Sequence, residues 1–439
     1  MRNAASGNSR GFLTRCAALL LAATAWPAWS GAAGDLVPQH SEDLRPALTR
    51  NGPAATLEFT AFSRNFRLQL SNNQRLARIA AGSSVQLYKG TIEGIPGSWA
   101  RISILNGLPR GMIWDGRELF IVDAAPEAVN YGAAGTVMYK LSDAVFERGV
   151  SFTGDTVEQP RDPAADYDAM IGELRARTQA LQAGVATEGV EVSILGDAAY
   201  LARYDNETQA HDAILTRLNN VDGIFSSQVG VELQVVSVNI GDELTTGLTA
   251  STDASALLDE LGRLRQHSKT LSGTGLTHLV TGRDLDGDTV GIAYRLGLCS
   301  PRYATSLTMA HNSAVLDSLV IAHEIGHVFG APHDGEQQCA STPQGQYIMT
   351  PTLTTSATSF SQCSLDQINA VLDSYSCVVA LPSPDPAPPA PPAPPAPPPG
   401  DGGGGGGGGS LDPSLLLLLL ALRAARPRHR DCGSSRGSR

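Results

Sequence analysis

Residues 323–334 read His-Glu-Ile-Gly-His-Val-Phe-Gly-Ala-Pro-His-Asp. An apolar run at 319–322 precedes them and predicts a buried helix. His323 and His327 are four residues apart, so both imidazoles project from one helical face, where a single metal ion can bridge them. Glu324 lies on the adjacent edge of that helix. Its carboxylate can therefore reach a water molecule at the metal without being a ligand itself.

The second half of this stretch supplies a third ligand. Gly330 permits the positive φ that ends a helix and turns the chain back, which lets His333 contribute another imidazole nitrogen. Three neutral imidazoles leave one position of a tetrahedral zinc open for water, as in catalytic rather than structural sites. The alternative is a helix whose histidines are satisfied by hydrogen bonds alone, but these polar groups would be costly on so apolar a helix. The motif therefore predicts a hydrolase that uses zinc-activated water, with Glu324 as general base.

The segments that precede the motif differ in their hydrophobic periodicity. Residues 50–125 show short alternations of apolar and polar residues separated by turns, which predict a small β domain. Residues 151–188 are polar and contain one predicted helix near 165–181. From residue 190 onward, predicted strands and helices alternate, which argues for an α/β layer architecture. These strands are expected at 190–194, 231–238, 278–281 and 290–294, and the helices at 210–225 and 257–264.

Both ends of the chain have the composition of sorting segments. The N-terminus combines arginines, an apolar run at 16–26 and small residues at 28–33, the three parts of a secretory signal peptide. The run is too short to span the ~30 Å of a membrane. Residues 381–410 are Pro-rich and then Gly-rich, which predicts an extended linker. Residues 411–439 hold a short apolar run and an Arg-rich tail.

The overall composition excludes one class of function. The 439 residues carry a net charge of -11, and only 17% of them are charged. A nucleic-acid-binding protein would show a basic face, so we expect no nucleic-acid partner. Nothing in the sequence predicts an oligomeric state.

Residues 190–377 resemble the metzincin zinc peptidases and, within that clan, the reprolysin/ADAM-like family. Asp334 after the third histidine is a mark of that family. So are Gly-Ile-Ala-Tyr at 291–294 and Ser-Phe-Ser-Gln-Cys-Ser at 359–364. Tyr-Ile-Met-Thr at 347–350 stands where the family has its Met-turn, which implies that Met349 forms an apolar floor beneath the zinc.

The resemblance also implies a fold and an activity. The catalytic domain would be an α/β domain with a mixed twisted sheet, an active-site helix, a Met-turn and a small C-terminal subdomain, preceded by a β-rich prodomain. The activity would be that of a zinc metalloendopeptidase on protein or peptide substrates. The strand at 290–294 would lie at the sheet edge, where an extended substrate could pair with it antiparallel. The C-terminal tail resembles the bacterial GlyGly-CTERM sorting signals, which implies processing by a rhomboid-type protease.

These observations give one predicted organisation and location. We expect a bacterial protein that is secreted and then either extracellular or tethered at the cell surface by its C-terminal segment. The predicted parts are a signal peptide (1–33), a β-rich prodomain (34–150), a boundary with one helix (151–188), the catalytic domain (189–380), the Pro- and Gly-rich linker (381–410) and the sorting signal (411–439).

The cysteines are compatible with an oxidising compartment. Cys16 and Cys432 lie in the segments expected to be removed, which leaves four cysteines and hence two disulfides with three alternative pairings. The family resemblance implies one pairing, Cys299–Cys377 with Cys339–Cys363. Many relatives keep their zymogen inactive with a prodomain cysteine on the zinc. Between residues 17 and 298 there is no cysteine, so latency here must come from steric cover or from another ligand.

A further acidic stretch and the function of the whole chain each have an alternative interpretation. Asp-Leu-Asp-Gly-Asp at 284–288 resembles a calcium loop but lacks the later Glu of an EF-hand, so a solvated turn is favoured over a Ca²⁺ site. The main alternative for the whole chain is a surface-tethered binding or adhesive protein with a vestigial zinc site. The intact Glu324 argues against that alternative. A zinc hydrolase acting on something other than peptides ranks lower, because a glycine-ended helix with a third histidine is typical of peptidases.

Overall fold

The computed structural model describes most of the chain between residues 36 and 381. It leaves out residues 1–35, 78, 81, 125–134, 147–149, 153, 159–187, 242–244, 246, 250 and 382–439. The predicted signal peptide, the helix expected near 165–181, all but the first residue of the linker, and the sorting signal therefore lie outside the described residues. Within the described part of the chain, no helix is both long and apolar enough to cross a membrane.

The N-terminal region is a nine-stranded antiparallel sheet, which fits the β-rich prediction. Its strand order is β2-β10-β9-β8-β7-β6-β5-β4-β3. The strands are β2 (Glu42–Leu44), β3 (Ala47–Asn51), β4 (Ala54–Ala61), β5 (Arg64–Asn72), β6 (Gln86–Ile92), β7 (Trp99–Leu105), β8 (Leu108–Trp114), β9 (Leu119–Ala124) and β10 (Thr136–Lys140). Leu57 and Phe59 face Leu68 and Phe66 across β4 and β5, so the alternating apolar residues form one buried face.

Short elements flank this sheet. The strand β1 (Leu36–Pro38) pairs with β11 (Ala144–Phe146), α1 (Gln74–Ala77) follows β5, and the 3₁₀ turn η1 (Leu141–Asp143) follows β10. None of these contributes a residue to the histidine motif.

The region that carries the histidine motif is built on a mixed sheet, as the sequence predicts. Its order is β13-β17-β18-β16-β14-β15, with β20 pairing with β14. Strands β15, β14, β16 and β18 are parallel, whereas β17 is antiparallel to β18 and β20 is antiparallel to β14. The strands are β13 (Thr156–Glu158), β14 (Glu188–Gly196), β15 (Val231–Ile240), β16 (Leu276–Thr281), β17 (Gly291–Arg295), β18 (Thr305–Met309) and β20 (Val378–Ala380).

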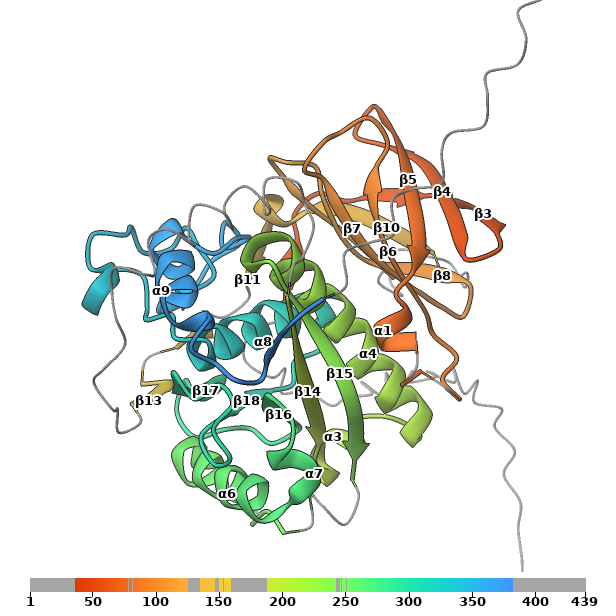
Figure 1. The fold of residues 1–439 in the computed structure, drawn as a ribbon. Coiled ribbons are helices and arrows are strands. Elements are labelled where there is room, and N and C mark those ends of the chain that lie inside the picture. Colours follow the sequence, from red (N-terminus) through yellow and green to blue (C-terminus); the bar gives the residue numbers. More distant parts are fainter. Residues whose placement is uncertain are drawn as a thin grey trace, which may run out of the picture. The chain divides into compact units, whose positions relative to one another are not determined.

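Helices cover this sheet, and one of them separates it from the N-terminal region. The helix α4 packs against β6, β7 and β8 of the N-terminal sheet and also against α8, as Figure 1 shows. The helix α8, which carries the histidine motif, is surrounded on all sides, because every residue from Val315 to Val328 is buried. The helices are α3 (Ala198–Leu201), α4 (Glu207–Ile224), α6 (Ala254–His267), α7 (Lys269–Ser272), α8 (Ala314–Val328) and α9 (Gln362–Leu372), with short turns η2 (Phe225–Val229) and η3 (Gln337–Cys339).

The start of the predicted boundary segment forms two strands against the catalytic region. The strand β12 (Val150–Ser151) pairs with β19 (Thr352–Leu353), and β13 pairs with β17. In this sheet β13 is the edge strand and β17 lies between β13 and β18, so β13 occupies the edge of β17 that the resemblance leaves open to a substrate. Sequence reasoning missed this segment because two- and three-residue strands have no measurable periodicity.

Candidate metal centre

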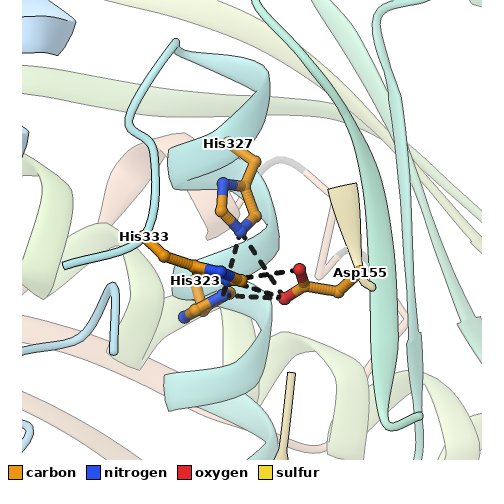
Figure 2. A group of neighbouring side chains, drawn as sticks. All are labelled: Asp155, His323, His327 and His333. Atoms are coloured by element: carbon orange, nitrogen blue, oxygen red, sulfur yellow. Dashed lines mark hydrogen bonds and ion pairs between the residues drawn. The ribbon is translucent and has the colours of Figure 1, made fainter. Parts of the chain in front are cut away.

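The helix α8 ends at Val328, just before the turn that brings the third histidine back to the other two. Gly330 adopts a φ of +113°, a conformation that residues with a Cβ rarely adopt. The chain then turns back, and His333 meets the two histidines of the helix. The Nε2 atom of His323 lies 3.0 Å from that of His327 and 3.3 Å from that of His333. Figure 2 shows the three rings converging on one point, as the spacing in the sequence predicts.

The Nδ1 atom of each ring lies close to an oxygen atom of the protein. His323 Nδ1 lies 2.6 Å from the Ile348 carbonyl, and His327 Nδ1 lies 2.8 Å from the Ala331 carbonyl. His333 Nδ1 lies 3.4 Å from a carboxylate oxygen of Glu336. A carbonyl can only accept a hydrogen bond, so Nδ1 of His323 and His327 must donate. That tautomer leaves the Nε2 lone pair free for a metal.

The donor set fits zinc. The three imidazole nitrogens are buried, they lie within bonding distance of a common centre, and carbonyls and a carboxylate support them from behind. Burial lowers the pKa of His323 to about 4, with the other two histidines adding to the shift and Asp155 opposing it. The neutral imidazole, which is the form that binds a metal, therefore predominates at physiological pH.

Glu324, the residue after His323, has a fully buried carboxylate, and neither of its oxygens has a hydrogen-bond partner among the described residues. Burial raises the pKa of Glu324 well above its ordinary value, and the nearby charge of Asp155 raises it further. Buried polar atoms are usually paired, so this carboxylate is placed for a partner that the described residues do not supply.

The Met-turn residues support both ends of the motif. Met349 is fully buried against α8, where a Cβ at Gly326 would lie 2.7 Å from the Met349 sulfur. The backbone N–H of Asp334 donates to the Met349 carbonyl at 2.7 Å, and the Nδ1–H of His323 donates to the carbonyl of Ile348. The apolar side chain therefore packs under the helix, while the backbone of the turn orients the ligands.

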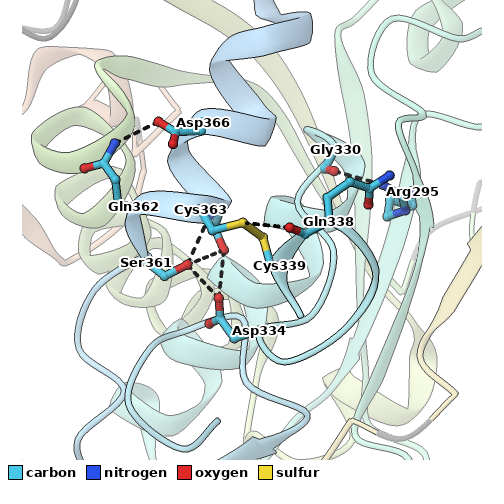
Figure 3. The surroundings of a disulfide bond; sticks show 10 residues. Arg295, Gly330, Asp334, Gln338, Cys339, Ser361, Gln362, Cys363 and Asp366 are labelled. Carbon is cyan, nitrogen blue, oxygen red and sulfur yellow. Dashed lines mark hydrogen bonds between the residues drawn. A yellow bond between two sulfur atoms is a disulfide. The ribbon is translucent and has the colours of Figure 1, made fainter. Parts of the chain in front are cut away.

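Asp334 links the third histidine to α9. Its carboxylate accepts hydrogen bonds from the hydroxyls of Ser361 at 2.6 Å and Ser364 at 3.3 Å, as Figure 3 shows for Ser361. Burial raises the pKa of Asp334, and the two serine hydroxyls oppose that shift. The residue is thus a structural anchor that holds the turn after α8 against the first turn of α9.

The four cysteines form two disulfides in the pairing that the resemblance implies. Cys299 is bonded to Cys377, and Cys339 is bonded to Cys363. The second bond joins η3 to α9 beside Asp334 (Figure 3). The first bond joins the loop between β17 and β18 to the residue that precedes β20.

The described residues contain a single cluster that could hold a metal ion, and it includes a residue that the sequence analysis did not select. This cluster consists of Asp155, His323, His327 and His333, whose ligand atoms lie within 4.8 Å of one another. Asp155 approaches from the side opposite α8 in Figure 2. The acidic residues at 284, 286 and 288 are exposed and form no comparable cluster within the described part of the chain.

Comparison with known proteins identifies the class of fold that carries this centre. Residues 186–361 match the family model of metallo-peptidase family M12 (Reprolysin_5). The chain is 26% identical over 396 residues to the human protein "A disintegrin and metalloproteinase with thrombospondin motifs 14". It is 27% identical over 290 residues to "Snake venom metalloproteinase H5" of Deinagkistrodon acutus. It is 24% identical over 191 residues to "Zinc metalloproteinase/disintegrin" of Bitis gabonica.

Each match covers only part of this chain and part of the relative. They cover 80%, 63% and 43% of this chain, and 32%, 66% and 58% of the three relatives, respectively. The predicted resemblance to the reprolysin family is confirmed at the family level. Members of family M12 are zinc metalloproteases, which agrees with the donor set described above. The bacterial origin and the sorting signal stay predictions.

Proposed function

We propose that this chain is a secreted zinc metalloendopeptidase in which His323, His327 and His333 hold the metal and Glu324 is the general base. The observation that carries the proposal is the convergence of three Nε2 atoms beside a buried carboxylate that has no other partner in the described residues. Bound zinc would polarise a water molecule, lower its pKa towards neutrality and stabilise the oxyanion.

The residues of the chain then have separate tasks. The histidines orient the metal through their Nδ1 partners. Glu324 accepts the proton of the attacking water and returns it to the leaving amine. The burial that raises its pKa also makes the carboxylate a stronger base than an exposed one. The strand β17 offers backbone groups to an extended peptide, once nothing else occupies the edge where β13 lies.

Secretion is part of the same proposal. The N-terminal signal-like segment predicts export, and two disulfides in the catalytic region support an oxidising compartment. Peptidase substrates outside the cell, and processing of the C-terminal tail at the cell surface, follow from the sequence predictions.

The test measures metal content and proteolysis together. We expect one zinc per chain in the full-length protein and in Glu324→Gln. We also expect casein cleavage by the wild type after limited trypsin treatment that removes the N-terminal region. The Glu324→Gln variant should lose about 10²- to 10⁴-fold in kcat, the usual contribution of a general base. If the wild type and Glu324→Gln both bind zinc and neither processed protein cleaves casein, a vestigial site in a binding protein is favoured. Absence of zinc would overturn the proposal.

A further inference from the structure

The carboxylate of Asp155 occupies the position opposite the three histidines. Its Oδ2 atom lies 3.0 Å from His323 Nε2 and 3.6 Å from His327 Nε2, and its Oδ1 atom lies 3.1 Å from His333 Nε2. Asp155 is fully buried, so the carboxylate can be stable there only beside positive charge. Carboxylate oxygen is an ordinary zinc ligand. Asp155 thus adds a carboxylate oxygen as a fourth donor to the three imidazole nitrogens.

The segment that carries Asp155 is fixed on both sides of the metal centre. Before Asp155, Phe152 stacks on the His323 ring with the centroids 3.8 Å apart, and its N–H donates to the Pro351 carbonyl at 2.8 Å. After Asp155, β13 follows β17, and Glu158 pairs with Arg295 at 2.5 Å. Residues 150–152 and 154–158, which we call the strap, therefore cross the centre, and its ligands are at most 6% exposed.

The strap is not placed as a substrate. The carbonyl of Asp155 accepts a hydrogen bond from the Ala293 N–H at 2.8 Å, so this peptide group is engaged with β17 while the side chain faces the histidines. The strap also runs parallel to β17, whereas the family resemblance implies that a substrate runs antiparallel. A carboxylate at the centre leaves no position for the attacking water. The strap can block the site without offering a bond for cleavage.

We propose that Asp155 is the fourth metal ligand of the latent chain and that the strap inhibits the peptidase until it is displaced. This inference rests on the proposed zinc function. It also accounts for latency in a chain that has no cysteine between residues 17 and 298. Activation then requires that Asp155 leave the metal, which frees the coordination position for water and the edge of β17 for a peptide.

A cobalt substitution tests the ligand directly. The Glu324→Gln chain, which cannot digest itself, would be compared with Glu324→Gln/Asp155→Ala and Glu324→Gln/Asp155→Cys, each loaded with Co²⁺. The visible absorption of Co²⁺ depends on the kind and number of its ligands. We expect the alanine variant to change the visible bands. We expect the cysteine variant to add a thiolate-to-cobalt charge-transfer band, which appears only if residue 155 touches the metal.

The release of zinc gives a second readout without proteolysis. Removal of the fourth ligand in Glu324→Gln/Asp155→Ala should speed zinc loss to a chelator by about ten- to hundredfold, in the range typical of altered metal support. The matched control is Glu324→Gln/Asp115→Asn, because Asp115 pairs with Arg64 in the N-terminal region. That variant should keep the cobalt spectrum and the rate of zinc loss of Glu324→Gln.

The outcomes separate the two proposals. If none of these chains binds Co²⁺ or Zn²⁺, the zinc peptidase proposal fails. If all of them bind metal with identical spectra and no charge-transfer band appears, Asp155 is not a ligand and only the strap inference is overturned. With Glu324 intact, the unprocessed Asp155→Ala chain should cleave casein faster than the unprocessed wild type. Equal rates before processing would contradict inhibition by Asp155.

Discussion

At the scale of single residues, the position of the base depends on a glycine in another element. Gly291 begins β17, and a Cβ there would lie 2.4 Å from Oε1 of Glu324. Since the Glu324 carboxylate has no hydrogen-bond partner in the described residues, packing alone positions it. The residue type at 291 therefore controls the catalytic geometry, although Gly291 contacts no metal ligand in the cluster.

We predict that Gly291→Ala displaces Glu324 and lowers kcat by about 10²-fold, because misplacement of a reacting group by about 1 Å has an effect of that size. The metal content should stay at one zinc per chain, since the three histidines are unchanged. Gly262→Ala serves as the control, because the atom nearest to its new Cβ would be a backbone oxygen of Arg302 at 3.1 Å, away from the motif. The measurement is casein or peptide cleavage by the processed proteins. Equal kcat values for the two variants would contradict the prediction.

At the scale of elements, the parallel strands β16 and β18 enclose an ionisable side chain. His278 of β16 is fully buried, with Nδ1 2.8 Å from the Ser306 hydroxyl of β18. Burial lowers the pKa of His278 to about 3. Unfolded histidine has a pKa of about 6.5, so folding depresses the pKa of this residue.

This shift predicts a pH dependence of stability. Above pH ~6.5 the neutral His278 ring makes its full contribution to the free energy of unfolding. As the pH falls towards 3, this contribution is lost, because His278 binds a proton in the unfolded chain but not in the folded one. Stability should drop by about 1.4 kcal/mol per pH unit in this window because of His278. His278→Asn keeps a partner for Ser306 but does not titrate. Urea unfolding at pH 5.5 and 4.5 should therefore show a slope about 1.4 kcal/mol smaller in the variant. Identical slopes would contradict the assignment.

At the scale of the whole molecule, the N-terminal sheet packs on the region with the histidine motif through one shared apolar core cluster, and buried polar pairs lie in the same contact. Arg101 of β7 pairs with Asp222 of α4 at 3.0 Å, and its guanidinium also donates to the Ser226 hydroxyl at 2.7 Å. Nearby, the side chain of Asn73 donates to that of Asn219 at 3.0 Å.

We predict that Arg101→Ala lowers the free energy of unfolding by about 3–5 kcal/mol, because Asp222 is left buried without its partner. The control is Arg67→Ala, whose ion pairs with Glu58 and Glu93 are solvent-exposed and should contribute at most about 1 kcal/mol. Denaturant unfolding of the unprocessed chains measures both. A loss for Arg101→Ala no larger than that for Arg67→Ala would contradict the prediction.

The sequence by itself was enough to predict the proposed metal ligands, the proposed general base and the order of the main elements. These features are local: i, i+4 spacing puts His323 and His327 on one face, and a glycine lets the chain return with His333. The alternations in β4, β5 and β7 likewise arise from neighbouring residues. Each of these patterns has a period or a fixed offset, which can be counted without coordinates.

Only the tertiary structure decided that Asp155 faces the histidines. Asp155 lies 168 residues before His323, in a polar stretch whose strands are too short for periodicity, so no offset links the two. The absence of a prodomain cysteine indicated that some other group must act, but not which one. The position of Asp155 follows from the pairing of β12 with β19 and of β13 with β17. Such contacts between distant segments form only when the whole chain packs, and that is why this part of the site could not be predicted from sequence alone.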